Sequence, residues 1–150
     1  MGIYQFKKTQ EINKPIQDVW HFISNPCNLK LITPDYMGFN ITSSYLPSNM
    51  YAGMIICYKV SPLLGIKMNW VTEITHVKEG KYFVDEQRVG PYKIWHHEHI
   101  LQASKKGTIM TDIVSYKPPF GIIGSLTNPI IKKKLKDIFD YRFKALAEIF

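Results

Sequence analysis

The sequence predicts an α+β fold, in which a curved antiparallel sheet of seven strands packs against a long C-terminal helix and two short helices follow the first strand. Segments rich in β-branched and aromatic residues fill the middle of the chain, and a long stretch of helical period follows them. The breaks between these segments are short, and short breaks join antiparallel neighbours, because a parallel crossover needs a dozen or more residues. The pattern therefore favours a meander.

The N-terminal part contains the first strand and both short helices. Ile3 to Ile12 alternates loosely between apolar and polar side chains, which is typical of a strand with one solvated face. Pro15 suits the first turn of a helix whose apolar positions recur at helical spacing, namely Ile16, Val19, Trp20 and Ile23. Asn25-Pro26 ends this helix, and Asn28 to Ile32 is expected to form the second one.

Six strands and one long helix complete the prediction. The expected strands are Gly38 to Tyr45, Ala52 to Val60, Ile66 to Val77, Tyr82 to Arg88, Tyr92 to Ala103 and Thr108 to Tyr116. The last segment has an apolar stripe of Ile131, Leu135, Ile138, Phe139, Phe143, Leu146 and Phe150, with Lys and Arg largely on its other sides. Because a straight helix cannot sit flush against a strongly curved sheet along its whole length, we expect an internal cavity between them.

Composition excludes several classes of protein. The chain has 150 residues and a mass of 17.5 kDa, so residues 1–150 are expected to form a single domain. It has no apolar run long enough for a membrane span and no signal-peptide pattern, so a cytoplasmic protein is expected. Cys27 and Cys57 have neither metal-ligand nor redox spacing. No nucleophile elbow, phosphate loop or dinucleotide fingerprint occurs, so nothing indicates a hydrolase, kinase or dehydrogenase.

The formal net charge of +7 permits an anionic partner. Its densest part is Lys132, Lys133, Lys134 and Lys136, which we expect on the outward side of the final helix. These lysines form either an ordinary solvated face or a weak contact with an anionic membrane surface. Nucleic-acid binding is not expected, because no recognised motif or stacking platform accompanies them. The sequence gives no indication of the oligomeric state.

Several motifs, together with the order of elements, carry a resemblance to a known family. They are Pro15-Ile16-Gln17-Asp18-Val19-Trp20, Asn25-Pro26, Phe83-Val84-Asp85-Glu86-Gln87, Gly90-Pro91-Tyr92, Trp95-His96-His97-Glu98-His99 and Phe139-Asp140-Tyr141-Arg142. The chain resembles the START-like helix-grip superfamily, also called SRPBCC or polyketide cyclase-like. Within it, the chain looks like the small bacterial ligand-binding branch related to proteins labelled cell division inhibitors. The resemblance implies a cavity for an apolar lipid, sterol-like or polyketide-like molecule, and only some members are enzymes.

Two histidines of one expected strand are the main candidates for chemistry. A period of two puts four residues of that strand on one face, namely Trp95, His97, His99 and Leu101. The two imidazoles would bond within the sheet, orient a ligand, or transfer protons together with Glu73 or Asp112. Asp85 and Asp112 are acids among apolar neighbours, and they form either exposed cross-strand pairs or a polar cluster with the histidines.

The expected ligand-binding residues are aromatic or polar side chains of the sheet and the final helix, with plain core packing as the alternative for the aromatic ones. They are Trp70, Gln87, Trp95, His97, His99, Tyr116, Phe139 and Phe143. A His-x-His pair with a carboxylate or third histidine nearby would also hold a metal. His21 and His76 have no evident reason to converge there, so neither a metal nor another cofactor is predicted.

The favoured hypothesis is therefore the binding of a small hydrophobic ligand between the sheet and the C-terminal helix. The alternative is a cyclase or dehydratase-type enzyme that uses pocket histidines and carboxylates for acid–base chemistry. The two hypotheses differ in geometry, because imidazoles and carboxylates that converge on one accessible spot favour chemistry and dispersed ones favour binding.

Overall fold

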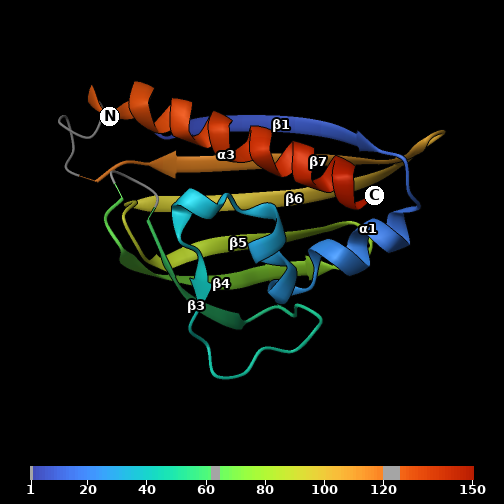
Figure 1. Cartoon of the computed structure of the whole chain (residues 1–150), viewed down its shortest axis with the longest axis horizontal. Coiled ribbons are helices and arrows are strands. Elements are labelled where there is room, and N and C mark those ends of the chain that lie inside the picture. Colours follow the sequence, from blue (N-terminus) through green and yellow to red (C-terminus); the bar gives the residue numbers. More distant parts are fainter. Residues whose placement is uncertain (1, 62–64, 120–125) are drawn as a thin grey trace.

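A computed structural model of the chain describes residues 2–61, 65–119 and 126–150, and its strands form one antiparallel sheet (Figure 1). The spatial order of the seven strands is β1-β7-β6-β5-β4-β3-β2, so the fold class predicted from the sequence is confirmed. The described elements are β1 (Tyr4–Ile12), α1 (Ile16–Ile23), the 3-10 helices η1 (Pro26–Ile32) and η2 (Asp35–Met37), β2 (Asn40–Ile41), β3 (Met54–Val60), β4 (Met68–Lys78), β5 (Tyr82–Val89), β6 (Ile94–Ser104), β7 (Gly107–Lys117) and α3 (Asn128–Ile149).

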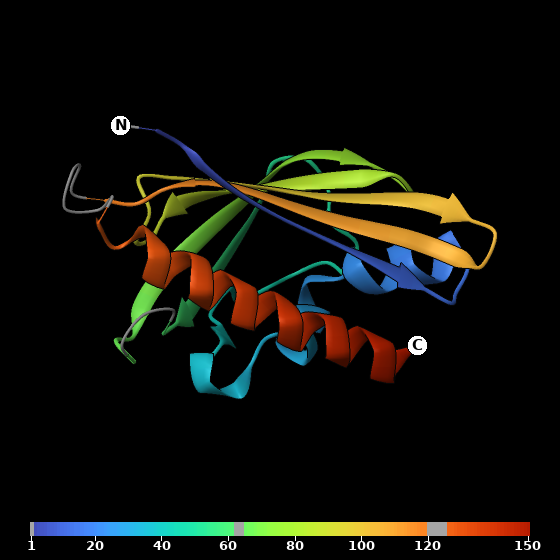
Figure 2. The same cartoon turned by 90° about the horizontal axis from the view of Figure 1, so that it is seen from above.

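Helix α3 runs along one face of the curved sheet, and α1 and the 3-10 helices lie on the same side (Figure 2). The hydroxyl of Tyr116 on β7 donates to Oδ1 of Asn128 over 2.7 Å at the start of α3. Further along, the Gln10 side chain of β1 donates to the carbonyl of Phe143 over 2.9 Å. These bonds hold α3 against the β1–β7 edge and leave the middle of the sheet facing the other helices.

The apolar interior divides into two clusters. One surrounds α1 and the end of α3 and includes Trp20, Phe83 and Leu146. The other lies beneath the first half of α3 and includes Tyr116 and Phe139. Between them, β6 and β7 point polar side chains inward, so the boundary between the two clusters is where a polar site lies.

Two local predictions differ from the structure. The strand expected over Gly38 to Tyr45 is reduced to β2, because the amides of Thr42 and Ser43 both donate to the carbonyl of Cys57 and the regular ladder ends there. The second short helix is a 3-10 helix that begins at Pro26, and its cap Asn25 accepts from the amide of Cys27. None of the helices among the described residues has the length and hydrophobicity that crossing a membrane requires.

The β6–β7 hairpin depends on Gly107, which has a φ of 144°. A side chain there would collide with the backbone carbonyl of Ile12, because the hairpin packs closely against the end of β1. The adjacent hydroxyl of Thr108 donates to the carbonyl of Lys14 over 2.8 Å. The turn therefore fixes the register of β6 against β7, on which the inward polar side chains depend.

Candidate functional site

A cavity of about 130 Å³ lies between the concave face of the sheet, the 3-10 helices and α3. Its walls are mostly aliphatic and aromatic, and its ionisable carboxylate, imidazole and basic groups gather on β5, β6 and α3. The lining residues are Leu29, Thr33, Met37, Phe39, Met50, Ile56, Tyr58, Val60, Trp70, Thr72, Ile74, Phe83, Asp85, Tyr92, Trp95, His97, His99, Lys134, Leu135, Ile138, Phe139 and Arg142. Bulky side chains on a concave sheet thus leave a space that the helix does not fill.

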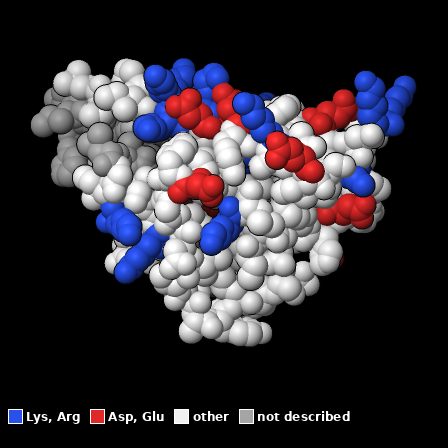
Figure 3. Space-filling view, in the orientation of Figure 1, with Lys and Arg blue, Asp and Glu red and all other residues white. Residues whose placement is uncertain are grey.

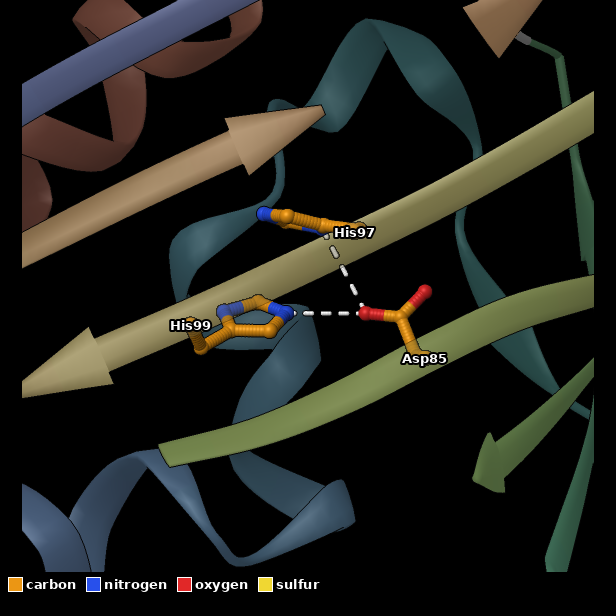
Figure 4. Close-up of side chains that lie close together, drawn as sticks. All are labelled: Asp85, His97 and His99. Atoms are coloured by element: carbon orange, nitrogen blue, oxygen red, sulfur yellow. Dashed lines mark hydrogen bonds and ion pairs between the residues drawn. The ribbon is translucent and has the colours of Figure 1, made fainter. Parts of the chain in front are cut away.

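Two histidines and two aspartates form a buried quartet at one wall of this cavity. Nε2 of His99 lies 2.8 Å from Oδ2 of Asp85, and Nδ1 of His97 lies 3.4 Å from the same oxygen (Figure 4). Oδ1 of Asp112 lies 2.9 Å from Nε2 of His97 and 3.1 Å from Nδ1 of His99. Each imidazole therefore has one ring nitrogen next to Asp85 and the other next to Asp112.

The quartet follows from strand register. Asp85 pairs with His97 across β5 and β6, and His99 pairs with Asp112 across β6 and β7. Since residues two apart on a strand share a face, His97 and His99 both point to the concave side and bring the acids of both neighbouring strands together. The imidazole rings lie 3.7 Å apart between centroids, and Phe83 stacks on the outer side of His99 at 4.0 Å.

Mutual pairing shifts the pKa of three of these groups, Asp85, His97 and Asp112. Burial alone raises the pKa of Asp112, but its hydrogen bonds with His97 and His99 outweigh this effect and hold that pKa below its usual value of 3.8. Burial likewise raises the pKa of Asp85, and the charge of His97 together with both imidazole bonds lowers it below that value. For His97, burial lowers the pKa, but the charges and hydrogen bonds of Asp85 and Asp112 raise it by more, so the net pKa lies above 6.5.

Arg142 of α3 joins the quartet at its edge. Its Nη1 lies 3.6 Å from Oδ1 of Asp112, and its guanidinium carbon lies 4.8 Å from the centre of the Phe139 ring. Nε and Nη1 of Arg142 are buried and have no hydrogen-bond partner in the described part of the chain. The guanidinium therefore balances the charge of Asp112 and keeps donor capacity that the described chain does not use.

A second polar group lies toward β3 and β4. The hydroxyl of Thr72 is 2.9 Å from the hydroxyl of Tyr58 and accepts from the indole N–H of Trp70 over 3.1 Å. Burial, and secondarily the charge of Asp85, raise the pKa of Tyr58, so its hydroxyl stays protonated. The three side chains satisfy one another and give this end of the cavity a neutral, hydroxyl-bearing wall.

The structure brings five of the predicted site residues to the cavity: Trp70, Trp95, His97, His99 and Phe139. The other three ligand-binding candidates lie elsewhere. Gln87 clamps the β5–β6 turn through two bonds with the backbone of Tyr92, and the hydroxyl of Tyr116 is bonded to the start of α3. Phe143 is 40% exposed and packs under the ammonium of Lys8.

Among the catalytic candidates, Asp112 joins the histidines, and Glu73 does not. Glu73 follows the inward Thr72 on β4, so it points to the convex face, where its Oε2 lies 2.5 Å from Nε of Arg88. The prediction that Glu73 acts together with the histidines is therefore wrong.

Sequence reasoning missed two parts of the site. Arg142 was expected on the polar side of the final helix, yet its side chain is 12% exposed and lines the cavity. Its spacing of three residues from Phe139 puts both on one helix face, a pattern that could have indicated this. Tyr58 and Thr72 carried no such indication, because an alternating strand pattern does not tell which inward hydroxyls meet a cavity.

The basic stretch is less uniform than expected. Figure 3 shows lysines and arginines over α3 with acidic side chains among them. Lys134 lines the cavity, with its ammonium 5.5 Å from the centre of the Tyr36 ring, so the expectation that all four lysines point outward is wrong. Lys136 pairs with Asp140 over 2.6 Å. Contact with an anionic membrane surface stays a prediction, and it now depends mainly on Lys132 and Lys133.

Solved structures with low sequence identity share the fold. The protein CV1439 from Chromobacterium violaceum matches with a TM-score of 0.72 and 14% identity, over 96% of this chain and 95% of that one. A protein from Arthrobacter aurescens gives 0.73 and 14%, over 96% and 86%. Ara h 8.0201, a Bet v 1-like protein, gives 0.64 and 13%, over 97% and 98%. The chain has the helix-grip fold. No protein-family model and no curated protein sequence matches it.

Proposed function

We propose that the protein binds a small hydrophobic ligand in the cavity, as the START-like proteins that its sequence resembles do. The observation that carries this proposal is the cavity of about 130 Å³, which has mostly apolar walls, a charged polar end at Arg142 and a neutral wall with the hydroxyls of Tyr58 and Thr72. An apolar wall with a few convergent polar groups is the usual composition of a small-molecule site. Burial of the ligand's apolar surface would supply most of the affinity.

The cavity volume limits the size of the ligand. Pockets for drug-sized molecules begin at about 300 Å³, whereas a cavity of about 150 Å³ accepts a benzene-sized molecule. With about 130 Å³, this cavity suits a single ring with short substituents. The aromatic side chains Trp70, Trp95 and Phe139 would pack against the faces and edges of such a ring.

The polar end indicates which substituent the ring carries. Arg142 has two buried N–H-bearing nitrogens without a hydrogen-bond partner among the described residues, and a ligand oxygen would satisfy donors that are otherwise costly to bury. An anionic oxygen makes the stronger, charge-assisted bond with a guanidinium. Lys134 at the cavity wall adds a second positive charge. The proposed ligand class is therefore a small cyclic or aromatic molecule with a carboxylate or phenolate oxygen.

Fluorescence of Trp70 and Trp95 tests this proposal, because both indoles line the cavity. We expect both benzoate and toluene to quench or shift the emission. The affinity obtained from that change should be at least about 10-fold higher for benzoate than for toluene, which has the same ring without the charge. Arg142→Met removes the guanidinium and should abolish that preference. Lys133→Met makes the same change of charge at an exposed position of α3 and should leave it intact.

Native mass spectrometry of the purified protein would identify a ligand that stays bound during purification. No saturable emission change with benzoate, toluene or any small aromatic compound, in a folded protein, would refute the proposal. A preference for benzoate that persists in Arg142→Met would refute the assigned polar end.

The convergence of imidazoles and carboxylates on one cavity wall favours acid–base catalysis as the second candidate. Against it, each ring nitrogen of His97 and His99 faces a carboxylate, so a substrate would have to displace one of these pairs to reach an imidazole. Conversion of a compound recovered from the protein, lost in His99→Ala with ligand binding retained, would establish the enzyme over the binding protein.

A further inference from the structure

The donor atoms of Asp85, His97 and His99 converge in a way that ligand binding does not require. These side chains each offer one ligand atom, and the three atoms lie within 4.8 Å of one another (Figure 4). Oδ2 of Asp85 is 2.8 Å from Nε2 of His99 and 3.4 Å from Nδ1 of His97. A metal with ligands at about 2.0–2.2 Å holds neighbouring donor atoms roughly 3.0–3.6 Å apart, so modest side-chain shifts would bring all three atoms into contact with one ion.

The opposite ring nitrogens have the partner that metal-binding histidines normally have. Oδ1 of Asp112 lies within hydrogen-bond distance of Nε2 of His97 and Nδ1 of His99. When each imidazole donates that N–H to Asp112, the lone pairs of His97 Nδ1 and His99 Nε2 point toward Asp85. A carboxylate behind the ligating imidazole fixes its tautomer and orientation in most histidine metal sites. One aspartate does this here for both rings.

We propose that Asp85, His97 and His99 bind one divalent metal ion, such as zinc, at the wall of the cavity. Two imidazoles and one carboxylate suit zinc, iron, copper or nickel better than magnesium or calcium, which prefer oxygen ligands. Three protein ligands leave at least one coordination position, which the surrounding cavity would make accessible to a small molecule. The inference goes beyond the proposed function and does not depend on it.

When both imidazoles are neutral, as metal ligands must be, the charges around the site favour a cation. Two carboxylates face the two imidazoles, and Arg142 stands 3.6 Å from Asp112, the acid that is not a ligand. Arg142 thus offsets the outer carboxylate and leaves the charge of Asp85 for the ion. Among the described residues, this is the one group of three histidine, cysteine or acidic side chains whose donor atoms come this close.

Zinc titration of the untagged protein, after removal of metals with EDTA, tests the proposal by calorimetry. We expect one zinc ion per chain. Asp85→Asn removes the anionic ligand and His99→Ala an imidazole, and each should weaken binding by more than the about 10–100-fold expected for Asp112→Asn, which removes only the carboxylate behind the rings. His96→Ala is the matched control, because His96 pairs with Glu86 on the opposite face and should leave zinc affinity unchanged.

X-ray absorption of the zinc-loaded wild-type protein keeps the test independent of variant folding, and it should show two imidazoles and no sulfur. Fewer than two imidazoles, no stoichiometric zinc, or affinity lost in His96→Ala and kept in His99→Ala would overturn the proposal. Zinc titration without benzoate tests the metal site alone, and benzoate titration in EDTA tests the cavity alone. Failure of one proposal is therefore distinguishable from failure of the other.

Discussion

The two faces of strands β5 and β6 carry histidine and carboxylate side chains in similar arrangements. On the concave face, Asp85 lies against His97 and His99, whose side chains are each 5% exposed. On the convex face, Glu86 accepts from His96 over 2.9 Å, and these side chains are 30% and 35% exposed. The inner cluster (Asp85, His97, His99 and Asp112) and the outer cluster (Glu86 and His96) thus share residue types and distances. They differ mainly in their access to water.

This difference decides what each cluster does. Water screens the outer ion pairs, so their net contribution to stability is small. Inside, unpaired charges would have no solvent to replace a lost partner, so every member of the quartet depends on the others. A buried ionic network of this kind usually stabilises a fold no more than apolar packing would, which makes a role in binding the better explanation for its presence.

The largest expected effect comes from breaking the inner cluster. Asp112→Ala leaves His97, His99 and Arg142 without their shared carboxylate, and we expect the free energy of unfolding to fall by about 3–5 kcal/mol. Urea denaturation at pH 6 measures it. The matched change on the outer face is Glu86→Ala, which should cost less than about 1 kcal/mol. Equal losses in the two variants would contradict the distinction between the clusters.

The pH dependence of stability should come mainly from the inner cluster. Folding lowers the pKa of Asp85 and Asp112 below 3.8, so their stabilising contribution is complete above that value and is lost as the pH falls below it. Folding raises the pKa of His97 above 6.5, so its contribution is present below pH 6.5 and is lost as the pH rises through the higher folded value.

Metal-free protein in EDTA should therefore be most stable between pH 3.8 and 6.5, and should lose about 2 kcal/mol between pH 5 and pH 3. Urea denaturation curves at a series of pH values from about 3 to about 9 measure both limbs of the stability profile, the loss at low pH and the loss at high pH. Asp112→Asn should flatten both limbs, whereas Glu86→Gln should leave them in place. An unchanged profile in Asp112→Asn would assign the pH dependence to other groups.

The sequence predicted most of the fold, because strand and helix periods are local properties. The alternation in β6 correctly placed His97 and His99 on one face, and the apolar stripe of α3 correctly predicted the helix that covers the sheet. What it left open was register. Whether Asp85 and Asp112 met the histidines or faced water depended on which residues paired across β5, β6 and β7, and no local pattern encodes that.

The same limit explains the errors. Glu73 and Asp112 were equivalent as acids within strands, and only their place in the alternation of β4 and β7 separates the outer residue from the inner one. Arg142 followed the general rule that charged helix residues face water, a rule that fails where a long helix crosses polar groups of the sheet. Sites of this kind break local rules because their geometry comes from distant segments.

Removing the outer histidine should have a small effect. His96→Ala loses one partly exposed bond to Glu86, so we expect a change of less than about 1 kcal/mol in the free energy of unfolding. High salt should reduce even this difference, because water and ions screen the pair. Urea denaturation at low and high salt measures both effects. A loss comparable to that of Asp112→Ala would mean that the outer cluster, too, holds buried charge.

The smallest expected effect is the coupling between Glu73 and Arg88. Their bond of 2.5 Å is short, yet Arg88 is 46% exposed and also lies 3.2 Å from Glu86, so it has a second partner when Glu73 is absent. A double-mutant cycle with Glu73→Ala and Arg88→Ala should therefore give a coupling free energy of about 0.2–1 kcal/mol that decreases with added salt. A larger coupling that salt does not change would show that distance, more than solvent access, separates strong from weak pairs in this sheet.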